Sequence, residues 1–512
     1  MEKRLILAIA LSLLILMSWS AFVSKMQPVD NTRVRKPDSP AAQPVINKPN
    51  LPPGAGPAVL TPPAVAEDTV TAFSTESLKV DFSDSRAAIK EVTFKKYHSY
   101  RFPLKYGLAI DDPLLIFQKQ LATDTEIIFI SKGNNQEITK RFTFDKSRYI
   151  IELEITIHNT GNSPLKTSLA LIPAVLDFSS RGNEVHYQNV AVFSEDKMLY
   201  PNPRKAGSWD KVKFLGWRER YFCGILQPGR GSYRLDLEKT TPQESQLVLR
   251  SAEFVLMPGE NSSQQFHIYL GPQELRLINS VNPDWAAVVH YGTFDFIARL
   301  LIQLLGLLQN VGHNWGLAII LLSIIIYLIL YPLTLKQMRS MKAMQALQPR
   351  IEQLRAAYKD NPQRLNKEIM ELYREYKVNP FGGCLPMILQ IPIFFALYQV
   401  LMRSATLKGA HFLWIKDLSG PDKLFILPQK MPFLGNEINI LPILMAITMF
   451  LQQKLSSKNT GSSSGEQQRL MLILFPIMFG FIFYRMPSGL VLYWFVNSLL
   501  MLTQQLLINR TK

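Results

Sequence analysis

The feature that most constrains the fold is a series of long apolar runs in the second half of the chain. An α-helix rises about 1.5 Å per residue, so a run of about 20 residues crosses a hydrocarbon core about 30 Å thick. We assign membrane helices to residues 317–335, 385–402, 438–453, 470–485 and 489–508. The third and fourth of these runs are short, so we expect the bilayer to become thinner around them.

A further apolar run lies near the start of the sequence. Lys3 and Arg4 precede a stretch from Leu5 to Val23 that contains no charged residue. We expect residues 1–23 to form an uncleaved signal-anchor helix whose positive start stays in the cytoplasm. Residues 24–68 are rich in proline, which favours an extended linker. Six membrane helices would place both termini in the cytoplasm and residues 24–293 on the outer side.

Residues 69–283 show the alternation of apolar and polar residues that is typical of half-buried β-strands. The clearest examples are LKVDF, IIELEITIH, YRLDLE and QQFHIYL. We therefore predict one large all-β domain, a sandwich of antiparallel strands. Within it, GWRERYFCGIL groups Trp217, Arg218, Tyr221 and Phe222, which could bind a ligand or simply pack at a strand end.

Two segments beside the membrane runs have their own character. Residues 294–310 carry few polar groups in an apolar background, which predicts a helix lying in the membrane interface.

Residues 336–377 are basic, and the positive-inside rule places them in the cytoplasm. Asn361 fits a helix N-cap and Pro362 a first helical position, so we predict a helical hairpin. The hairpin either packs on itself as a solvated arm or docks nucleic acid, lipid headgroups or nascent protein.

The hairpin is also where we place the residues that would recruit a partner. These candidates are Lys336, Arg339, Lys342, Arg350, Arg355, Lys359, Arg364 and Lys367.

Polar side chains interrupt the apolar runs, and those at depth carry no charge. They are Ser323, Tyr327, Gln390, Thr448, Gln452, Asn497 and Ser498. Polar groups in hydrocarbon are costly, so they face a protein interior or a wet cavity. These side chains either hydrogen-bond between helices or line a shared hydrated groove.

The composition and the absence of known motifs limit the partners and the kinds of activity that we expect. The net charge of +16 points to anionic lipid or nucleic acid as a partner, or to positive-inside bias alone. The histidines are scattered without metal-ligand spacing, and the sequence contains no Walker loop, dinucleotide fingerprint or nucleophile elbow. We therefore expect no metal, no cofactor and no enzymatic activity.

Three long stretches resemble the signature motifs of the YidC/Oxa/Alb family of membrane protein insertases. They are YPLTLKQMRSMKAMQALQPRI, KVNPFGGCLPMILQIPIFFALY and MPSGLVLYWFVNSLLMLTQQ. The anchor, the linker and the β domain are similar to the Gram-negative form of the family. The resemblance implies a multi-domain protein of the bacterial inner membrane. It would combine a polytopic α-helical part, in which five of six membrane helices form the insertase core (residues 284–512), with a periplasmic all-β supersandwich.

The resemblance also implies a function and partners. Such a protein inserts newly synthesised inner-membrane proteins and helps them fold, alone or with the Sec translocon, through a hydrophilic groove open to cytoplasm and lipid. Its expected partners are nascent membrane proteins, Sec components and membrane lipids, and not DNA. The ribosome is a further candidate, although only residues 509–512 follow the last apolar run and would form a short tail.

One position departs from the family pattern. The family usually carries a groove arginine on its first core helix, and this sequence has Tyr327 there. The role that the resemblance implies for this arginine, attracting acidic residues of the substrate, is therefore not carried over to Tyr327. The groove residues expected overall are Ser323, Tyr327, Gln390, Thr448, Gln452, Tyr493, Trp494, Asn497 and Ser498. Two rival readings are a transporter or channel with a periplasmic cap, and a membrane-tethered domain that binds or modifies carbohydrate.

Overall fold

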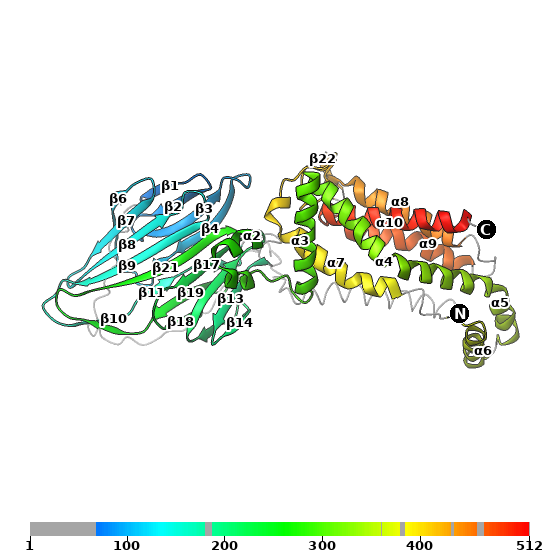
Figure 1. Cartoon of the computed structure of the whole chain (residues 1–512), viewed down its shortest axis with the longest axis horizontal. Coiled ribbons are helices and arrows are strands. Elements are labelled where there is room, and N and C mark those ends of the chain that lie inside the picture. The colour runs from blue at the N-terminus through cyan, green and yellow to red at the C-terminus, as the bar shows by residue number, and fades with distance from the viewer. Residues whose placement is uncertain are drawn as a thin grey trace, which may run out of the picture.

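The computed structural model describes residues 68–179, 187–359, 361–378, 385–431, 435–457 and 465–510. The predicted anchor at 1–23 and nearly all of the predicted linker at 24–68 lie outside these residues. Figure 1 shows two parts along the long axis of the molecule, a β-rich part (residues 70–272) at one end and helices at the other.

The β-rich part is built from antiparallel sheets. The largest sheet has nine strands, in the order β14 (Lys197–Leu199), β13 (Asn189–Ser194), β16 (Val212–Arg218), β17 (Phe222–Pro228), β21 (Asn261–Pro272), β9 (Ile150–Asn159), β8 (Gln136–Phe144), β7 (Glu126–Lys132) and β6 (Gln118–Ala122). A second sheet has six, in the order β15 (Gly207–Trp209), β18 (Tyr233–Thr241), β19 (Glu244–Ser251), β11 (Ala170–Ile172) and β5 (Ala109–Ile110), with β12 (Val175–Asp177) also on β19.

Smaller sheets complete this part of the chain. Four strands follow one another in sequence order, β1 (Val70–Ser74), β2 (Leu78–Ser83), β3 (Ala88–Phe94) and β4 (Tyr100–Gly107). A pair is formed by β10 (Leu165–Thr167) and β20 (Phe254–Leu256).

The four strands predicted from alternation are confirmed as β2, β9, β18 and β21. In β9 the side chains of Ile151, Leu153 and Ile155 are buried, whereas Glu152 between them is exposed. The alternation therefore separates a core face from a solvent face, as a pleated strand requires. The aromatic cluster in GWRERYFCGIL packs rather than forming an open site, because Trp217 and Phe222 are both buried.

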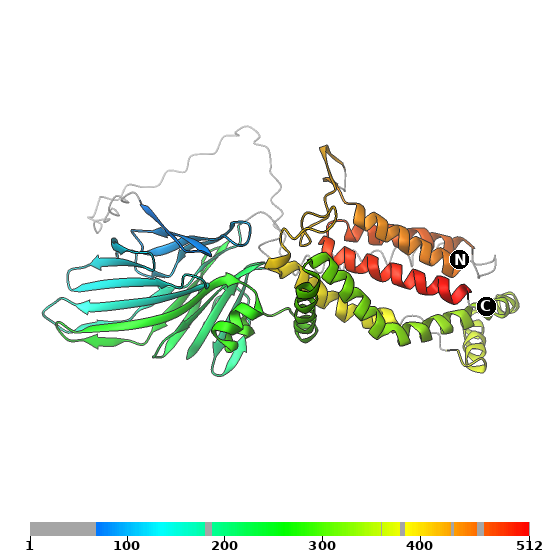
Figure 2. The same cartoon turned by 45° about the horizontal axis from the view of Figure 1, so that its top comes forward.

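A helical segment follows the last strand of the β-rich part. The helices are α2 (Leu275–Val281), η2 (Pro283–Val288), α3 (Asp295–Gly312), α4 (Trp315–Ala346), α5 (Gln348–Ala357), α6 (Pro362–Glu375), α7 (Leu385–Arg403), η4 (Ala405–Leu407), α8 (Ile440–Ser457), α9 (Gly465–Phe483) and α10 (Ser488–Arg510). We call α4, α7, α8, α9 and α10 the bundle. Figure 2 shows α4, α8, α9 and α10 running along the long axis, and α10 packs against α4, α7 and α8.

Within the described residues, two helical segments are long and apolar enough to cross a membrane, Trp315–Met344 and Ser488–Ile508. Shorter apolar segments cover Leu389–Arg403, Ile440–Leu455 and Ile473–Phe483. The count of six membrane helices stays a prediction. The interfacial helix predicted at 294–310 corresponds to α3, which packs against α4 and α7.

The hairpin differs from its prediction in one respect. Residues 336–346 are not a separate arm, because α4 continues through them to Ala346. The break comes at Leu347, just before Pro349 in the first turn of α5. Asn361 caps α6 as predicted, since its side chain accepts a hydrogen bond from the Arg364 N–H at 3.1 Å.

The helix predicted at 438–453 also begins later, at Ile440. The residues before it form a hairpin of β22 (Phe425–Met431) and β23 (Gly435–Ile438), which the sequence analysis did not predict.

Candidate functional site

Polar side chains from three helices of the bundle meet α10. Tyr327 on α4 donates its hydroxyl to Gln504 Oε1 at 2.7 Å. Gln390 on α7 donates through Nε2 to the Tyr493 hydroxyl at 2.6 Å. On α8, Gln452 Nε2 lies 3.7 Å from the sulfur of Met501. The last helix of the bundle thus carries the partners of polar groups on all three neighbours.

The contact between Tyr327 and Gln504 is deeply buried. Tyr327 is 8% exposed and Gln504 is 4% exposed. The Tyr327 hydroxyl also lies 3.3 Å from the carbonyl of Leu500. Among the described residues, nothing accepts a hydrogen bond from the buried Nε2 of Gln504. An unpaired buried donor costs about 1–3 kcal/mol, so an acceptor that reaches this nitrogen gains a ready partner.

Gln504 was missed by the sequence analysis. It belongs to a pair of glutamines near the end of the last apolar run, which resembles a solvent-exposed helix end. The spacing of Gln504 from other polar residues of the same run could have identified it. Tyr493, Asn497 and Gln504 are separated by four and seven residues, which places them along one helix face.

Three of the predicted groove residues are satisfied within their own helices. Ser323 donates to the Ile319 carbonyl at 2.7 Å. Thr448 donates to the Met445 carbonyl at 2.8 Å. Asn497 donates to the Tyr493 carbonyl at 3.0 Å. Such back-bonding satisfies a polar group without linking helices, so these three side chains do not bridge neighbouring helices.

Two predicted residues of α10 are mainly packing groups. Trp494 lies between aromatic side chains of α7 and α9, with its ring centre 5.4 Å from those of Phe394 and Phe483. Aromatic pairs at this separation add about 0.5–1.5 kcal/mol beyond their buried area. Ser498 is buried. The predicted set is therefore mixed, with Tyr327, Gln390, Gln452 and Tyr493 making contacts between helices.

The predicted cations of the hairpin all lie at the surface. Figure 1 places α5 and α6 at the end of the molecule farthest from the β-rich part. The hairpin buries Leu347, Ile351 and Leu372 in a small cluster of its own. Arg364 and Lys367 each lie 3.9 Å from a glutamate one turn later. Exposed pairs of this kind contribute about 0–1 kcal/mol, so the charges remain available to a partner.

Arginines join the β-rich part to the bundle. Arg218 and Arg403 both donate to the carbonyl of His290, at 2.8 and 3.4 Å. Burial, together with the positive charge of Arg403, lowers the pKa of Arg218 to about 9. Arg220 donates to the carbonyls of Met402 at 2.9 Å and Ser419 at 3.0 Å. These bonds fix one end of the bundle against the β-rich part.

The described residues contain no cluster of three or more His, Cys, Asp or Glu side chains that could hold a metal ion. Cys223 is a free, buried thiol whose pKa is raised to about 12 by burial. The other cysteine, Cys384, lies outside the described residues.

Comparisons with known proteins identify both parts of the chain. Residues 307–512 match the family model described as 60Kd inner membrane protein, and residues 117–304 match that of the YidC periplasmic domain. The relative named membrane protein insertase YidC in Syntrophobacter fumaroxidans is 37% identical over 384 residues, covering 73% of this chain and 68% of the relative.

Two further relatives with the same name cover more of the chain. The one from Pelobacter propionicus is 31% identical over 555 residues, covering 100% of this chain and 99% of its own. The one from Geobacter sulfurreducens is 31% identical over 478 residues, covering 85% of each chain. The chain therefore belongs to the YidC family of membrane protein insertases.

Proposed function

We propose that this protein inserts newly made membrane proteins into the bacterial inner membrane through the polar contacts that α10 makes with α4, α7 and α8. The observation that carries this proposal is the set of uncharged hydrogen-bonding groups buried among apolar helices, one of which keeps an unused donor at Gln504 Nε2. A family member with this arrangement can offer partners to a polar chain without holding it by charge.

The physical task is to carry a short polar segment past hydrocarbon. A backbone or side-chain polar group without a partner costs several kcal/mol in such surroundings. Gln504 Nε2 can donate to a carbonyl or carboxylate of the passing chain, and Gln390 and Tyr493 can exchange their mutual hydrogen bond for bonds to it. Each exchange replaces one bond with another, which keeps the barrier low and the segment free to leave.

The driving force in this proposal comes from the substrate. Once the polar segment has passed, the apolar segment behind it leaves the water for lipid, which stabilises it by about 25 cal/mol per Å² of apolar surface. No nucleotide is required. The shortness of the bundle helps, because the 18 residues of α8 span only about 27 Å, less than a core about 30 Å thick.

The proposed topology has six membrane helices, with both termini in the cytoplasm and residues 24–293 in the periplasm. The positive-inside rule supports this orientation, since the exposed cations of the hairpin and the β-rich part lie at opposite ends of the bundle. In this orientation the hairpin recruits substrate. The Sec translocon, membrane lipids and the ribosome are further proposed partners.

Photo-crosslinking tests the proposal directly. A photoreactive residue at position 327 should capture a ribosome-stalled nascent membrane protein. The same residue at Ile329, which is 69% exposed on the surface of α4, is the matched control and should capture lipid. Crosslinks from position 327 to neighbouring helices alone would contradict the proposal. A transporter or channel would instead show solute flux through the purified protein in liposomes.

A further inference from the structure

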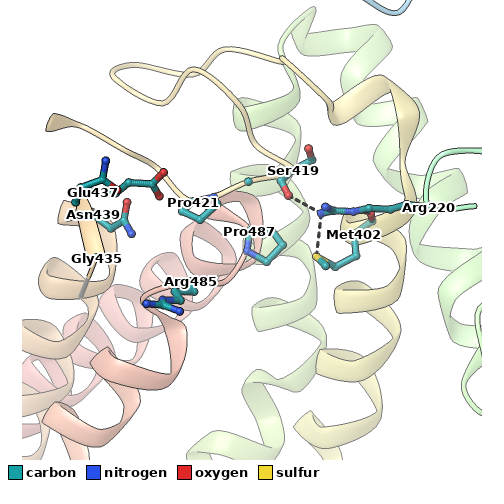
Figure 3. Close-up of a pocket in the computed structure, with 11 residues that line it drawn as sticks. Arg220, Met402, Ser419, Pro421, Gly435, Glu437, Asn439, Arg485 and Pro487 are labelled. Atoms are coloured by element: carbon teal, nitrogen blue, oxygen red, sulfur yellow. Dashed lines mark hydrogen bonds between the residues drawn. The ribbon is translucent and has the colours of Figure 1, made fainter. Parts of the chain in front are cut away.

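A polar cavity lies where the β-rich part meets the bundle (Figure 3). Its volume is about 390 Å³, within the range of sites that bind small molecules. One wall comes from the end of α7 and the loop after it, another from β23, and a third from the turn between α9 and α10. Arg220 enters from the β-rich part.

Two guanidinium groups reach this cavity from different sides, those of Arg220 and Arg485 (Figure 3). The bonds to Met402 and Ser419 use Nε and Nη2 of Arg220, so this side chain is held in place. Its Nη1 makes no hydrogen bond to any residue that the structure describes. A planar guanidinium matches the oxygens of a phosphate, and such charged hydrogen bonds are about twice as strong as neutral ones.

The carboxylate in the cavity wall, that of Glu437, is already paired with a cation outside the cavity. Glu437 lies 2.7 Å from the ammonium group of Lys423, which balances it. The remaining polar lining includes the amide of Asn436, which can donate to an oxygen, whereas the amide of Asn439 already donates to the carbonyl of Tyr484 at 2.7 Å. The cavity therefore suits a compact anion that is rich in acceptor oxygens.

The surroundings of the cavity indicate an anion that carries hydrocarbon. The cavity lies at the level where α7 and α9 end and where α8 and α10 begin. Beside it, strand β22 exposes Phe425 (58%) and Ile426 (69%). These residues pair with Ile438 and Glu437 of β23, so the apolar start of β22 is continuous with the cavity wall. A water-soluble phosphate ion would bury no apolar surface against Phe425 and Ile426, whereas the acyl chains of an amphiphile would.

We infer that this cavity binds the headgroup of a phospholipid, with Arg220 and Arg485 donating to its phosphate and its acyl chains lying along Phe425 and Ile426. The inference goes beyond insertion itself and rests on the proposed crossing of the membrane by the bundle. A lipid held at this point would fill the space between the β-rich part and the helix ends.

Native mass spectrometry of the full-length protein in detergent, titrated with phosphatidylglycerol, tests the inference without any insertion substrate. Arg485→Gln should weaken binding of the tightest lipid about tenfold, the loss expected for one charged hydrogen-bonding group. The lipid affinity of Arg485→Lys should lie between those of Arg485→Gln and wild type. Lys416→Gln is the matched control, because Lys416 is an exposed cation of the loop after α7 and does not line the cavity.

The apolar side of the site is tested by Phe425→Ser and Ile426→Ser together. Both side chains are exposed, so the fold should survive, while lipid binding should fall severalfold. Excess inorganic phosphate should leave the lipid bound, and full displacement by phosphate alone would overturn the assignment to a lipid. The Arg485→Gln variant should unfold at the same temperature as wild type. If its dissociation constant for the lipid then stays within about twofold of the wild-type value, the site itself would be overturned.

Discussion

The hydrogen bond between Tyr327 and Gln504 should stabilise the packing of α4 on α10 by a measurable amount. Interhelical hydrogen bonds in membrane proteins contribute about 0.6 kcal/mol on average and up to about 1.7 kcal/mol. This bond is short, at 2.7 Å, and both residues are buried. We therefore expect a coupling energy of about 1 kcal/mol in a double-mutant cycle of Tyr327→Phe and Gln504→Leu.

The structure also predicts that the two single variants differ. Tyr327→Phe leaves both ends of the Gln504 amide unpaired, which should cost about 1–2 kcal/mol. Gln504→Leu removes the unpaired Nε2 and leaves the Tyr327 hydroxyl near the Leu500 carbonyl, so it should cost less. Reversible unfolding in mixed detergent micelles measures both free energies.

A suitable control is Tyr331→Phe, one helical turn away. Tyr331 is 39% exposed and packs against the Tyr327 ring, so losing its hydroxyl should change stability by less than about 0.5 kcal/mol. Zero coupling between Tyr327 and Gln504, or a larger loss for Gln504→Leu than for Tyr327→Phe, would refute the reasoning.

Three other outcomes are expected. Tyr327→Arg should extend insertion to substrates with acidic translocated segments, and an unchanged substrate range would mean that charge at this position is irrelevant here. Ser323→Leu with Gln390→Leu should impair insertion in a stably expressed protein, mostly through Gln390 because Ser323 bonds to its own helix; normal insertion would count against the polar site. Burial raises the pKa of Glu274 even though Tyr97 donates to it at 2.6 Å, so the folded state binds this proton more tightly than the unfolded chain does. The resulting stability is present below the unfolded pKa and is lost as pH rises through the folded pKa. Glu274→Gln should therefore raise the melting temperature more at neutral than at acidic pH, and an equal effect at both would exclude this titration as the cause.

The fold was most predictable where one local pattern decides the structure. Alternation identified β9 because its apolar side chains share one face, whatever the strand pairs with. The turn of the hairpin was predictable at Asn361 because capping depends on a few neighbouring backbone groups. Neither prediction required information about residues far away in the sequence.

The parts that could not be predicted depend on how separate elements meet. Gln504 finds Tyr327 only because α10 packs against α4 in one rotational setting, and no local pattern encodes that setting. Arg220 sits in an ordinary strand-loop sequence, yet it contacts Met402 at the end of α7. The hairpin of β22 and β23 was missed because its residues combine proline with irregular apolar spacing, which masks the strand pattern.

The order of the helices along the chain has a consequence for how this protein is made. The partners of Tyr327, Gln390 and Gln452 all lie on α10, which the ribosome synthesises after α4, α7 and α8. Until α10 emerges, these three side chains lack the neighbours that they have in the finished molecule. During translation these three contacts can therefore form only after α10 has been synthesised.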